Sequence, residues 1–367
     1  MKKLIAIIAL VMVLTTVLAS CVSRTPGDSE ETTKDLNQIL DEVQKDMENS
    51  GMEGSEIVAE VIYKAYDDHA EVIGCQLPMG SVSILEEFDG KKVTKIADNA
   101  FQGMNSVTEI ILPDSIVSIG DKAFMSCVAL TSVKMSAGLE TIGRYAFYGC
   151  LALTTVEIGA GVESIGENAF GSCIALSAIS VADGNKDFAA EDGVLFSADK
   201  TVLVQYPAGK NNMQYTIPET VTTVNNFAFS YAKALTSVDT NKVTDLGDYT
   251  FSSCAALENV NLGSGLTQIG AGTFQKCTKL TSIEIPEGVV SLGYKNDEGA
   301  ECGASFYGCS ALNAVSLPST LKNIYLRCFE GCDTLTQVTY NGTKAEWEKV
   351  VVGEDNGVIQ NIGVVTK

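Results

Sequence analysis

The sequence predicts an α/β solenoid, a stack of rungs of 23 residues that each supply one short strand and one short helical turn. Phenylalanine recurs at this interval, and the residue types around each phenylalanine recur with it. A unit of this size cannot bury its own apolar face, so stacking on its neighbours is what completes a core. The recurring phenylalanines are Phe101, Phe124, Phe147, Phe170, Phe229, Phe251, Phe274, Phe306 and Phe329.

Fixed slots surround each phenylalanine. Apolar residues lie eight and five positions before it, a small residue directly precedes it, cysteine and leucine lie three and six positions after it, and an apolar pair follows at nine and eleven. The alternating pair predicts a strand, and the spacing from the small residue to the cysteine predicts a helical or 3₁₀ turn. This combination is typical of a leucine-rich-repeat solenoid. Around Phe124 the slots hold Ile116, Ile119, Ala123, Cys127, Leu130, Val133 and Met135.

Residues 1–20 predict a lipoprotein signal peptide. A basic start, Met1 to Lys3, precedes an apolar run, Leu4 to Leu18, that is too short to span a bilayer comfortably. The run ends in Leu18-Ala19-Ser20-Cys21, which resembles the bacterial lipobox, in which the cysteine is acylated. We therefore expect Cys21 to be lipidated and to anchor the protein at the bacterial cell surface. The alternative is a plain secreted protein with an incidental cysteine.

The segments that follow predict a tether and a cap. Residues 21–34 are almost entirely small and polar, and such a segment cannot bury enough surface to fold, so we expect a disordered tether. Residues 35–90 predict an N-terminal cap with a short amphipathic helix over 35–49 and strands over 57–66 and 70–75.

Leucine-rich repeats are expected over residues 91–182 and 217–340. Between them, residues 183–216 predict a hairpin insertion, because two apolar runs flank a turn at residues 197–200. Residues 341–367 predict a C-terminal cap over the last rung.

Composition and charge limit the function. The chain has 46 Asp and Glu against 25 Lys and Arg, for a net charge of -21, so it repels phosphate backbones and binding to nucleic acid is excluded. The single histidine, His69, lies in a predicted turn between Asp67-Asp68 and a strand, and no nucleophile or metal partner is indicated for it. We expect no enzyme activity, no cofactor and no metal site.

Eleven cysteines invite a disulfide interpretation, yet seven of them occupy one repeat slot between Phe and Leu, where a small buried hydrophobe suits the packing. Stacked parallel side chains do not point at each other as a disulfide requires. Free buried thiols are therefore favoured over some disulfide pairing and over metal ligation. Cys328 occupies the small-residue slot, Cys302 lies in an irregular segment and is the more reactive candidate, and Cys75 is left undecided.

Two other features have a chemical and a structural interpretation. Gly-Asp or Gly-Glu pairs recur before the expected helical turns, for example at Gly120-Asp121 and Gly166-Glu167. They lack the alternating carboxylates of a calcium loop, so capping of the helical turn is the simpler prediction. Trp347 could anchor a ligand, but in a closing segment it is expected to shield the core.

Segments such as Ser118-Ile119-Gly120-Asp121-Lys122-Ala123-Phe124 and Phe147-Tyr148-Gly149-Cys150 resemble the BspA-type leucine-rich repeat family of bacterial surface proteins. The resemblance extends from about residue 57 to residue 350. It implies a non-catalytic scaffold that binds host proteins or other cells in adhesion. The alternatives are a surface glycan-capture module and a structural spacer.

The residues that flank the inward strand slots predict the candidate binding face. They are expected to face solvent as a small, polar strip suited to an extracellular protein or cell surface, or to a glycan. The candidate residues are Ser132, Lys134, Thr155, Glu157, Ser237, Asp239, Asn259, Asn261, Ser282, Glu284, Gln337 and Thr339.

Overall fold

The computed structural model describes residues 60–76 and 80–366. The chain divides into two units, Met1–Ile57 and Val58–Lys367, and all described residues belong to the second. The predicted signal peptide, the lipidated Cys21, the tether and the helix over 35–49 lie outside the described residues.

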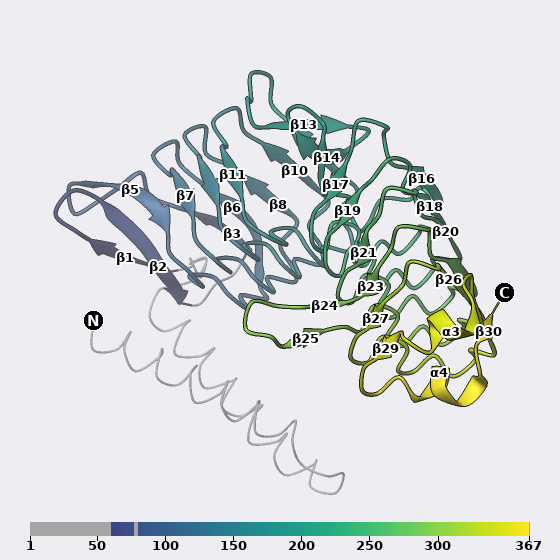
Figure 1. Cartoon of the computed structure of the whole chain (residues 1–367). Coiled ribbons are helices and arrows are strands. Elements are labelled where there is room, and N and C mark those ends of the chain that lie inside the picture. The colour runs from purple at the N-terminus through teal and green to yellow at the C-terminus, as the bar shows by residue number, and fades with distance from the viewer. Residues whose placement is uncertain (1–59, 77–79, 367) are drawn as a thin grey trace, which may run out of the picture. The chain divides into compact units, whose positions relative to one another are not determined.

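The second unit is a β-solenoid in which most rungs contribute two strands, one before and one after the central phenylalanine (Figure 1). The strands before the phenylalanines form the upstream row, which is parallel from β5 onward apart from hairpins that join it. Its strands are β5 (Lys91–Ile96), β7 (Ser118–Ile119), β9 (Thr141–Ile142), β11 (Ser164–Ile165), β15 (Val202–Gln205), β17 (Thr223–Val224), β19 (Asp245–Leu246), β21 (Gln268–Ile269), β23 (Ser291–Leu292), β27 (Asn323–Ile324) and β29 (Val351–Val352).

The strands after the phenylalanines form the downstream row, whose paired neighbours are all parallel. The apolar pair at nine and eleven positions after each phenylalanine points inward here, for example Val156 and Ile158, which are both buried. The strands are β3 (Gly80–Ser83), β6 (Val107–Ile111), β8 (Ser132–Lys134), β10 (Thr155–Ile158), β12 (Ala178–Val181), β16 (Gln214–Thr216), β18 (Ser237–Asp239), β20 (Asn259–Asn261), β22 (Ser282–Glu284), β26 (Ala314–Leu317), β28 (Gln337–Tyr340) and β30 (Val365–Thr366).

The first and last rungs carry extra elements. At the N-terminal end β1 (Glu60–Ala65) pairs antiparallel with β2 (Ala70–Gln76), β2 pairs in parallel with β5, and β4 (Glu87–Phe88) pairs antiparallel with β5. At the C-terminal end lie the helices α3 (Lys344–Trp347) and α4 (Gly357–Ile362). Thr343 caps α3 in a capping box with Glu346, and the Trp347 ring lies 5.4 Å from that of the buried Tyr340.

The expected turn of helix in each rung is not helical in the described structure. The residues two positions before and two after the phenylalanine adopt positive φ, as Lys122 (57°) and Ser126 (61°) do around Phe124. Alternate N–H groups consequently point out of the rung: those of Lys122, Phe124 and Ser126 donate to carbonyls of the next rung at 2.7–2.8 Å. The turn is a third hydrogen-bonded ladder between rungs, because left-handed residues cannot continue a helix.

The phenylalanines and cysteines hold the rungs in register. Phe101, Phe124, Phe147 and Phe170 form one stack with ring centroids 5.1–5.5 Å apart. In each of the seven rungs with cysteine in the slot, the Sγ donates to the carbonyl of the preceding rung's phenylalanine, at 3.0 Å from Cys127 to Phe101. A small buried donor is therefore what this slot requires.

Rungs approach each other most closely at the glycine four positions before the phenylalanine. A Cβ added to Gly143 would lie 2.5 Å from the carbonyl carbon of Gly120, and one added to Gly166 would lie 2.6 Å from that of Gly143. The acidic residue that follows each glycine accepts a backbone N–H from the next rung, as Asp121 Oδ1 does from Arg144 at 2.7 Å. These carboxylates therefore join rungs, and the helix caps expected at Gly120-Asp121 and Gly166-Glu167 are absent.

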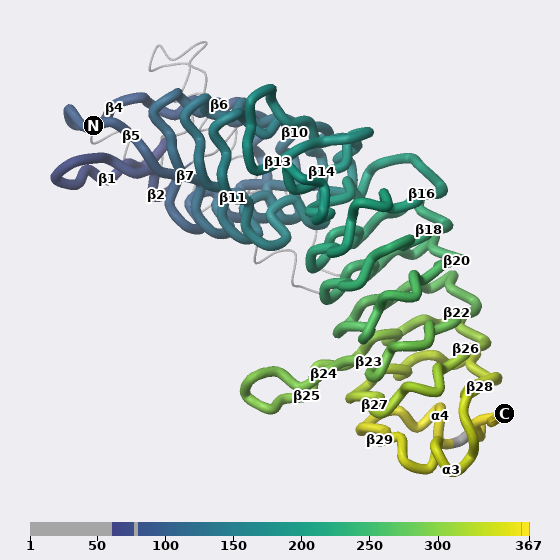
Figure 2. The backbone as a smooth tube through the Cα atoms, turned by 45° about the horizontal axis from the view of Figure 1, so that its top comes forward, coloured from purple at the N-terminus to yellow at the C-terminus, as the bar shows by residue number. Residues whose placement is uncertain are grey.

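The insertion divides the core into two clusters. β13 (Phe188–Glu191) pairs antiparallel with β14 (Val194–Ser197), and β14 pairs antiparallel with β15. β15 then pairs in parallel with β17, so the last strand of this insertion already belongs to the stack. Figure 2 shows the solenoid tube changing direction between β14 and β16.

A second phenylalanine-type stack begins after the insertion with Tyr206. Its ring lies 4.8 Å from that of Phe229, and the stack continues to Phe329. Further along, β24 (Tyr294–Lys295) and β25 (Glu301–Cys302) pair antiparallel in a hairpin that projects from the rungs in both views (Figures 1 and 2).

Candidate functional site

The predicted binding strip lies on the downstream row, and all of its residues are exposed or half-buried. Strand pairing brings some members side by side: Glu157 is opposite Ser180, and Asp239 is opposite Asn261, whose Nδ2 donates to Asp239 Oδ2 at 3.0 Å. The row is split into four separate sheets, with breaks between β8 and β10, β12 and β16, and β20 and β22. The twelve candidates therefore form several short polar segments.

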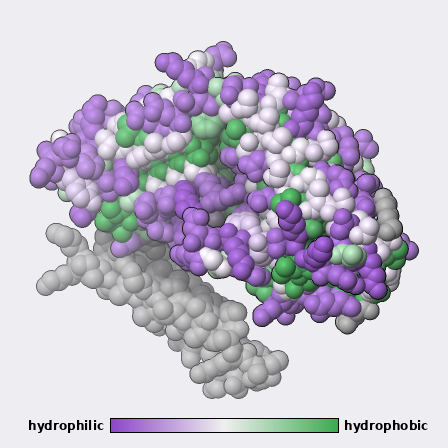
Figure 3. All heavy atoms as spheres, in the orientation of Figure 1, coloured by the Kyte–Doolittle hydropathy of each residue, from purple (hydrophilic) through white to green (hydrophobic). Residues whose placement is uncertain are grey.

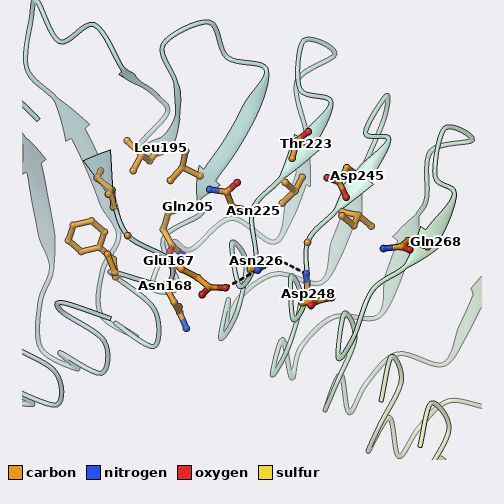
Figure 4. A pocket seen from close by; sticks show the side chains of 18 of the residues that line it. Glu167, Asn168, Leu195, Gln205, Thr223, Asn225, Asn226, Asp245, Asp248 and Gln268 are labelled. Atoms are coloured by element: carbon orange, nitrogen blue, oxygen red, sulfur yellow. Dashed lines mark hydrogen bonds between the residues drawn. The ribbon is translucent and has the colours of Figure 1, made fainter. Parts of the chain in front are cut away.

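Two hollows of about 460 and 530 Å³ lie along the other row, the upstream one. The larger is open and lies over β7, β9 and β11. The smaller lies where the two core clusters meet, and we call it the seam pocket (Figure 4). Figure 3 shows apolar residues gathered over the upstream row from β7 to β14, with hydrophilic residues around them.

A short rung creates the seam pocket. Leu203 pairs with Val224 and so occupies the apolar slot that elsewhere lies five positions before the phenylalanine. In this rung only two residues separate Leu203 from Tyr206, whereas four separate Val224 from Phe229. The glycine and the acidic residue of the usual corner are missing, and the space they would fill is open.

Polar side chains surround this space. Its walls include Glu167, Asn225, Asn226, Asp245 and Asp248, while the apolar part of the lining comes from the β11 turn, β14 and β15. Figure 4 shows the first two of these coming from opposite sides of the seam. Asn225 stands in the slot that is glycine in the tightly stacked rungs, because its neighbour, the short rung, leaves room for a side chain.

Hydrogen bonds cross the seam and fix one edge of the pocket. Asn226 Nδ2 donates to Glu167 Oε1 at 2.8 Å, and the backbone N–H of Asp248 donates to Asn226 Oδ1 at 2.8 Å (Figure 4). Tyr294 donates its hydroxyl to Asp248 Oδ2 at 2.5 Å, and this hydrogen bond together with burial raises the pKa of Tyr294. Glu167 is also paired with Arg144 at 2.6 Å.

The pocket is electrically one-sided. Three carboxylates, Glu167, Asp245 and Asp248, line it, and no lysine, arginine or histidine is among its lining residues. Arg144 reaches Glu167 from the neighbouring rung. Among the described side chains, none makes a hydrogen bond to the carboxylate of Asp245, which is exposed. Such a lining favours ligands that carry positive charge or several hydrogen-bond donors.

The remaining candidates for chemistry are accounted for structurally. His69 stacks on Tyr66 and lies 2.7 Å from Asp68 Oδ1, and hydrogen bonds to Asp68 and Glu71 raise its pKa. Burial raises the pKa of the slot thiols, that of Cys127 to about 12, so they stay protonated donors. In the described ranges, no group of three or more His, Cys, Asp or Glu is placed to hold a metal ion.

The seam left a sequence signal that the phenylalanine register does not include. Tyr206 lies 23 residues before Phe229, and Tyr215 and Ile217 follow it at nine and eleven positions. The insertion therefore contains a full rung with tyrosine in the phenylalanine slot. Because that rung lacks the usual Ile-Gly-acidic corner, its slots do not align with the others.

The chain belongs to the BspA type leucine rich repeat family, whose model matches six copies over residues 85–191, 208–296 and 302–350. No curated protein matches it. Within residues 60–76 and 80–366 no helix has the length and apolar character needed to cross a membrane.

Solved structures of bacterial repeat proteins share the fold. A leucine-rich repeat protein from Eubacterium ventriosum is 21% identical, with a TM-score of 0.56 over 79% of this chain and 90% of that one. The pneumococcal vaccine antigen PcpA is 19% identical, with a TM-score of 0.52 over 86% and 99%. A leucine rich cell surface protein from Faecalibacterium prausnitzii is 24% identical, with a TM-score of 0.49 over 81% and 97%.

Proposed function

We propose that this protein is a lipid-anchored, non-catalytic scaffold at the bacterial cell surface that binds host proteins or other cells. The leader and Cys21 supply the proposed anchor, and membership of a surface-protein repeat family supports the location. Solenoids present extended surfaces whose curvature and side chains are fixed by stacking, so they suit binding of large partners.

The observation that carries the proposal is the rigid presentation of polar groups on both strand rows. Each rung is tied to the next by strand pairing, a turn ladder and a phenylalanine stack, so exposed side chains repeat at fixed positions. On the downstream row this applies to the predicted strip, and on the upstream row to the walls of the seam pocket.

The proposal is tested with the full chain displayed on lipid vesicles. Binding to matrix proteins, mucins, oligosaccharides and whole bacterial cells is measured at physiological salt. Saturable binding to a protein or cell, lost when Asn259, Asn261 and Glu284 are replaced together by alanine, supports adhesion through the strip. Binding to glycans alone favours glycan capture, and no binding across the panel favours a structural spacer.

Lipidation is tested separately with Cys21→Ser. We expect the wild-type chain to partition into membranes and to gain the mass of attached lipid, and the variant to remain unacylated and be released. An unmodified, membrane-free wild-type chain would contradict the anchor without affecting the binding proposal.

A further inference from the structure

We propose that the seam pocket is a peptide-binding site that takes a short, glycine-containing, positively charged segment of a partner protein. The inference rests on the binding function proposed above and names its ligand class and site. The ligand's backbone would occupy the place of the two missing corner residues and complete the interrupted ladder.

The ladder shows what the pocket lacks. In the rung of Phe147, the N–H of Tyr145 donates to the carbonyl of Glu167 at 3.0 Å, and the carbonyl of Ile142 accepts the N–H of Gly166 at 2.7 Å. The corner dipeptide Gly166-Glu167 thus satisfies one acceptor and one donor of the preceding rung. The same exchange occurs between the rungs of Phe124 and Phe147.

At the seam the equivalent groups have no partner among the described residues. The carbonyl of Ile165 accepts no hydrogen bond, and the N–H groups of Asn168 and Phe170 donate none. All three residues line the pocket. An unpaired backbone edge beside an open space is a template for an added segment, and peptide addition to such edges is a common mode of recognition.

A second observation supports an incomplete site. Three buried side-chain polar atoms lack a hydrogen-bond partner among the described residues, namely Asn168 Oδ1, Tyr206 OH and Ser230 Oγ. They belong to the three consecutive rungs at the seam, and their residues are at most 7% exposed. Buried polar groups are normally paired, so their concentration here indicates that the stack is unsatisfied at this place.

Stacking geometry and charge define the peptide. In the regular stack, the glycine of each corner lies so close to the preceding glycine that a Cβ would clash, as at Gly143 and Gly166. A ligand residue above Gly166 must therefore also be glycine. The carboxylates of Glu167, Asp245 and Asp248, with no cation in the lining, favour a lysine or arginine next to it.

The test is calorimetric titration of the detergent-solubilised full chain with acetyl-Ile-Gly-Lys-Ser-amide. We expect saturable binding that is at least about tenfold weaker when the glycine is replaced by alanine or the lysine by glutamate. Equal binding of the alanine peptide, or no binding of the glycine peptide, would overturn the proposal.

Two variants locate the binding. Asn225→Trp fills the pocket from an exposed position and should abolish binding, while Asp245→Lys should weaken it several-fold, more at low salt than at high salt. Asp333→Lys makes the same charge change at an exposed turn outside the pocket and should leave the affinity unchanged. Unfolding profiles verify that all three remain folded, and equal affinities across all three would refute the site.

The outcomes also separate this inference from the proposed function. If the chain binds cells or proteins as before when Asn225→Trp is present and the peptide does not bind, the scaffold function stands and the peptide site is wrong. Capture of an oligosaccharide that Asn225→Trp abolishes would assign the pocket to glycans and refute the peptide class.

Discussion

The phenylalanine stack predicts how stability depends on position in the solenoid. Phe124 is fully buried and stacks on both Phe101 and Phe147 at 5.1 Å, whereas Phe170, 2% exposed, stacks on Phe147 alone at 5.5 Å. Replacing a buried phenylalanine by alanine costs about 3–5 kcal/mol in transfer and cavity terms. Each aromatic stack adds about 0.5–1.5 kcal/mol.

Phe124→Ala should therefore destabilise the protein by about 0.5–1.5 kcal/mol more than Phe170→Ala, because it removes one additional stack. Both residues belong to the same core cluster, so the comparison is made within one cooperative region. Urea unfolding followed by circular dichroism gives the difference, provided the two variants share the same m-value. Equal losses, or a larger loss for Phe170→Ala, would show that the seam does not interrupt the stack energetically.

Three further predictions test other parts of the fold. A thiol reagent at pH 8 should modify the half-buried Cys302 in the native protein and reach the seven slot cysteines only on unfolding, since burial raises their pKa; rapid native modification of a slot thiol would contradict this. Gly143→Ala should cost about 1–3 kcal/mol by overpacking, whereas Gly159→Ala, whose Cβ meets nothing within 3.8 Å, should be nearly neutral, and similar losses in thermal unfolding would refute the close-approach argument. His69 should titrate above 6.5 by NMR; its raised folded pKa makes a stabilising contribution that is present below pH 6.5 and lost as the pH rises through the folded value, and His69→Gln should remove that dependence.

Much of the rung follows from residue types at fixed spacing. The slots for Phe147, Cys150 and Leu153 require apolar or small residues because all three side chains are fully buried, and burial acts directly on sequence. The twofold alternation after each phenylalanine likewise reflects which strand side chains point inward. These features recur in every rung, so the sequence repeats the signal many times.

The turn conformation could not be obtained in the same way. The left-handed positions are filled by residues such as Lys122, Tyr145, Phe227 and Tyr249, whose types give no sign of positive φ. Their conformation is imposed by carbonyls of the neighbouring rung, which accept the N–H groups that a helix would have used internally. Spacing alone cannot distinguish these two uses of the same donors, since both place residues three apart on one side.

The seam was hidden for a different reason. Its pocket arises from residues that are missing between Leu203 and Tyr206, and absent residues leave no motif. The only compensating signals are single substitutions, such as Asn225 in a glycine slot and Ala232 in the cysteine slot. Where Ala232 removes the thiol donor, Gln205 Nε2 donates to the carbonyl of Tyr206 at 3.1 Å instead.

That replacement shows how a repeat protein can gain a binding site at low energetic cost. A regular rung uses its backbone groups on its neighbours, so little of its edge is left for a ligand. Shortening one rung frees a carbonyl and two N–H groups around a hollow of about 460 Å³, while Gln205 and the Glu167–Asn226 bond keep the two halves joined. Recognition of a peptide is then expected where the repeat is broken, because only there does the stack present the groups with which it otherwise binds itself.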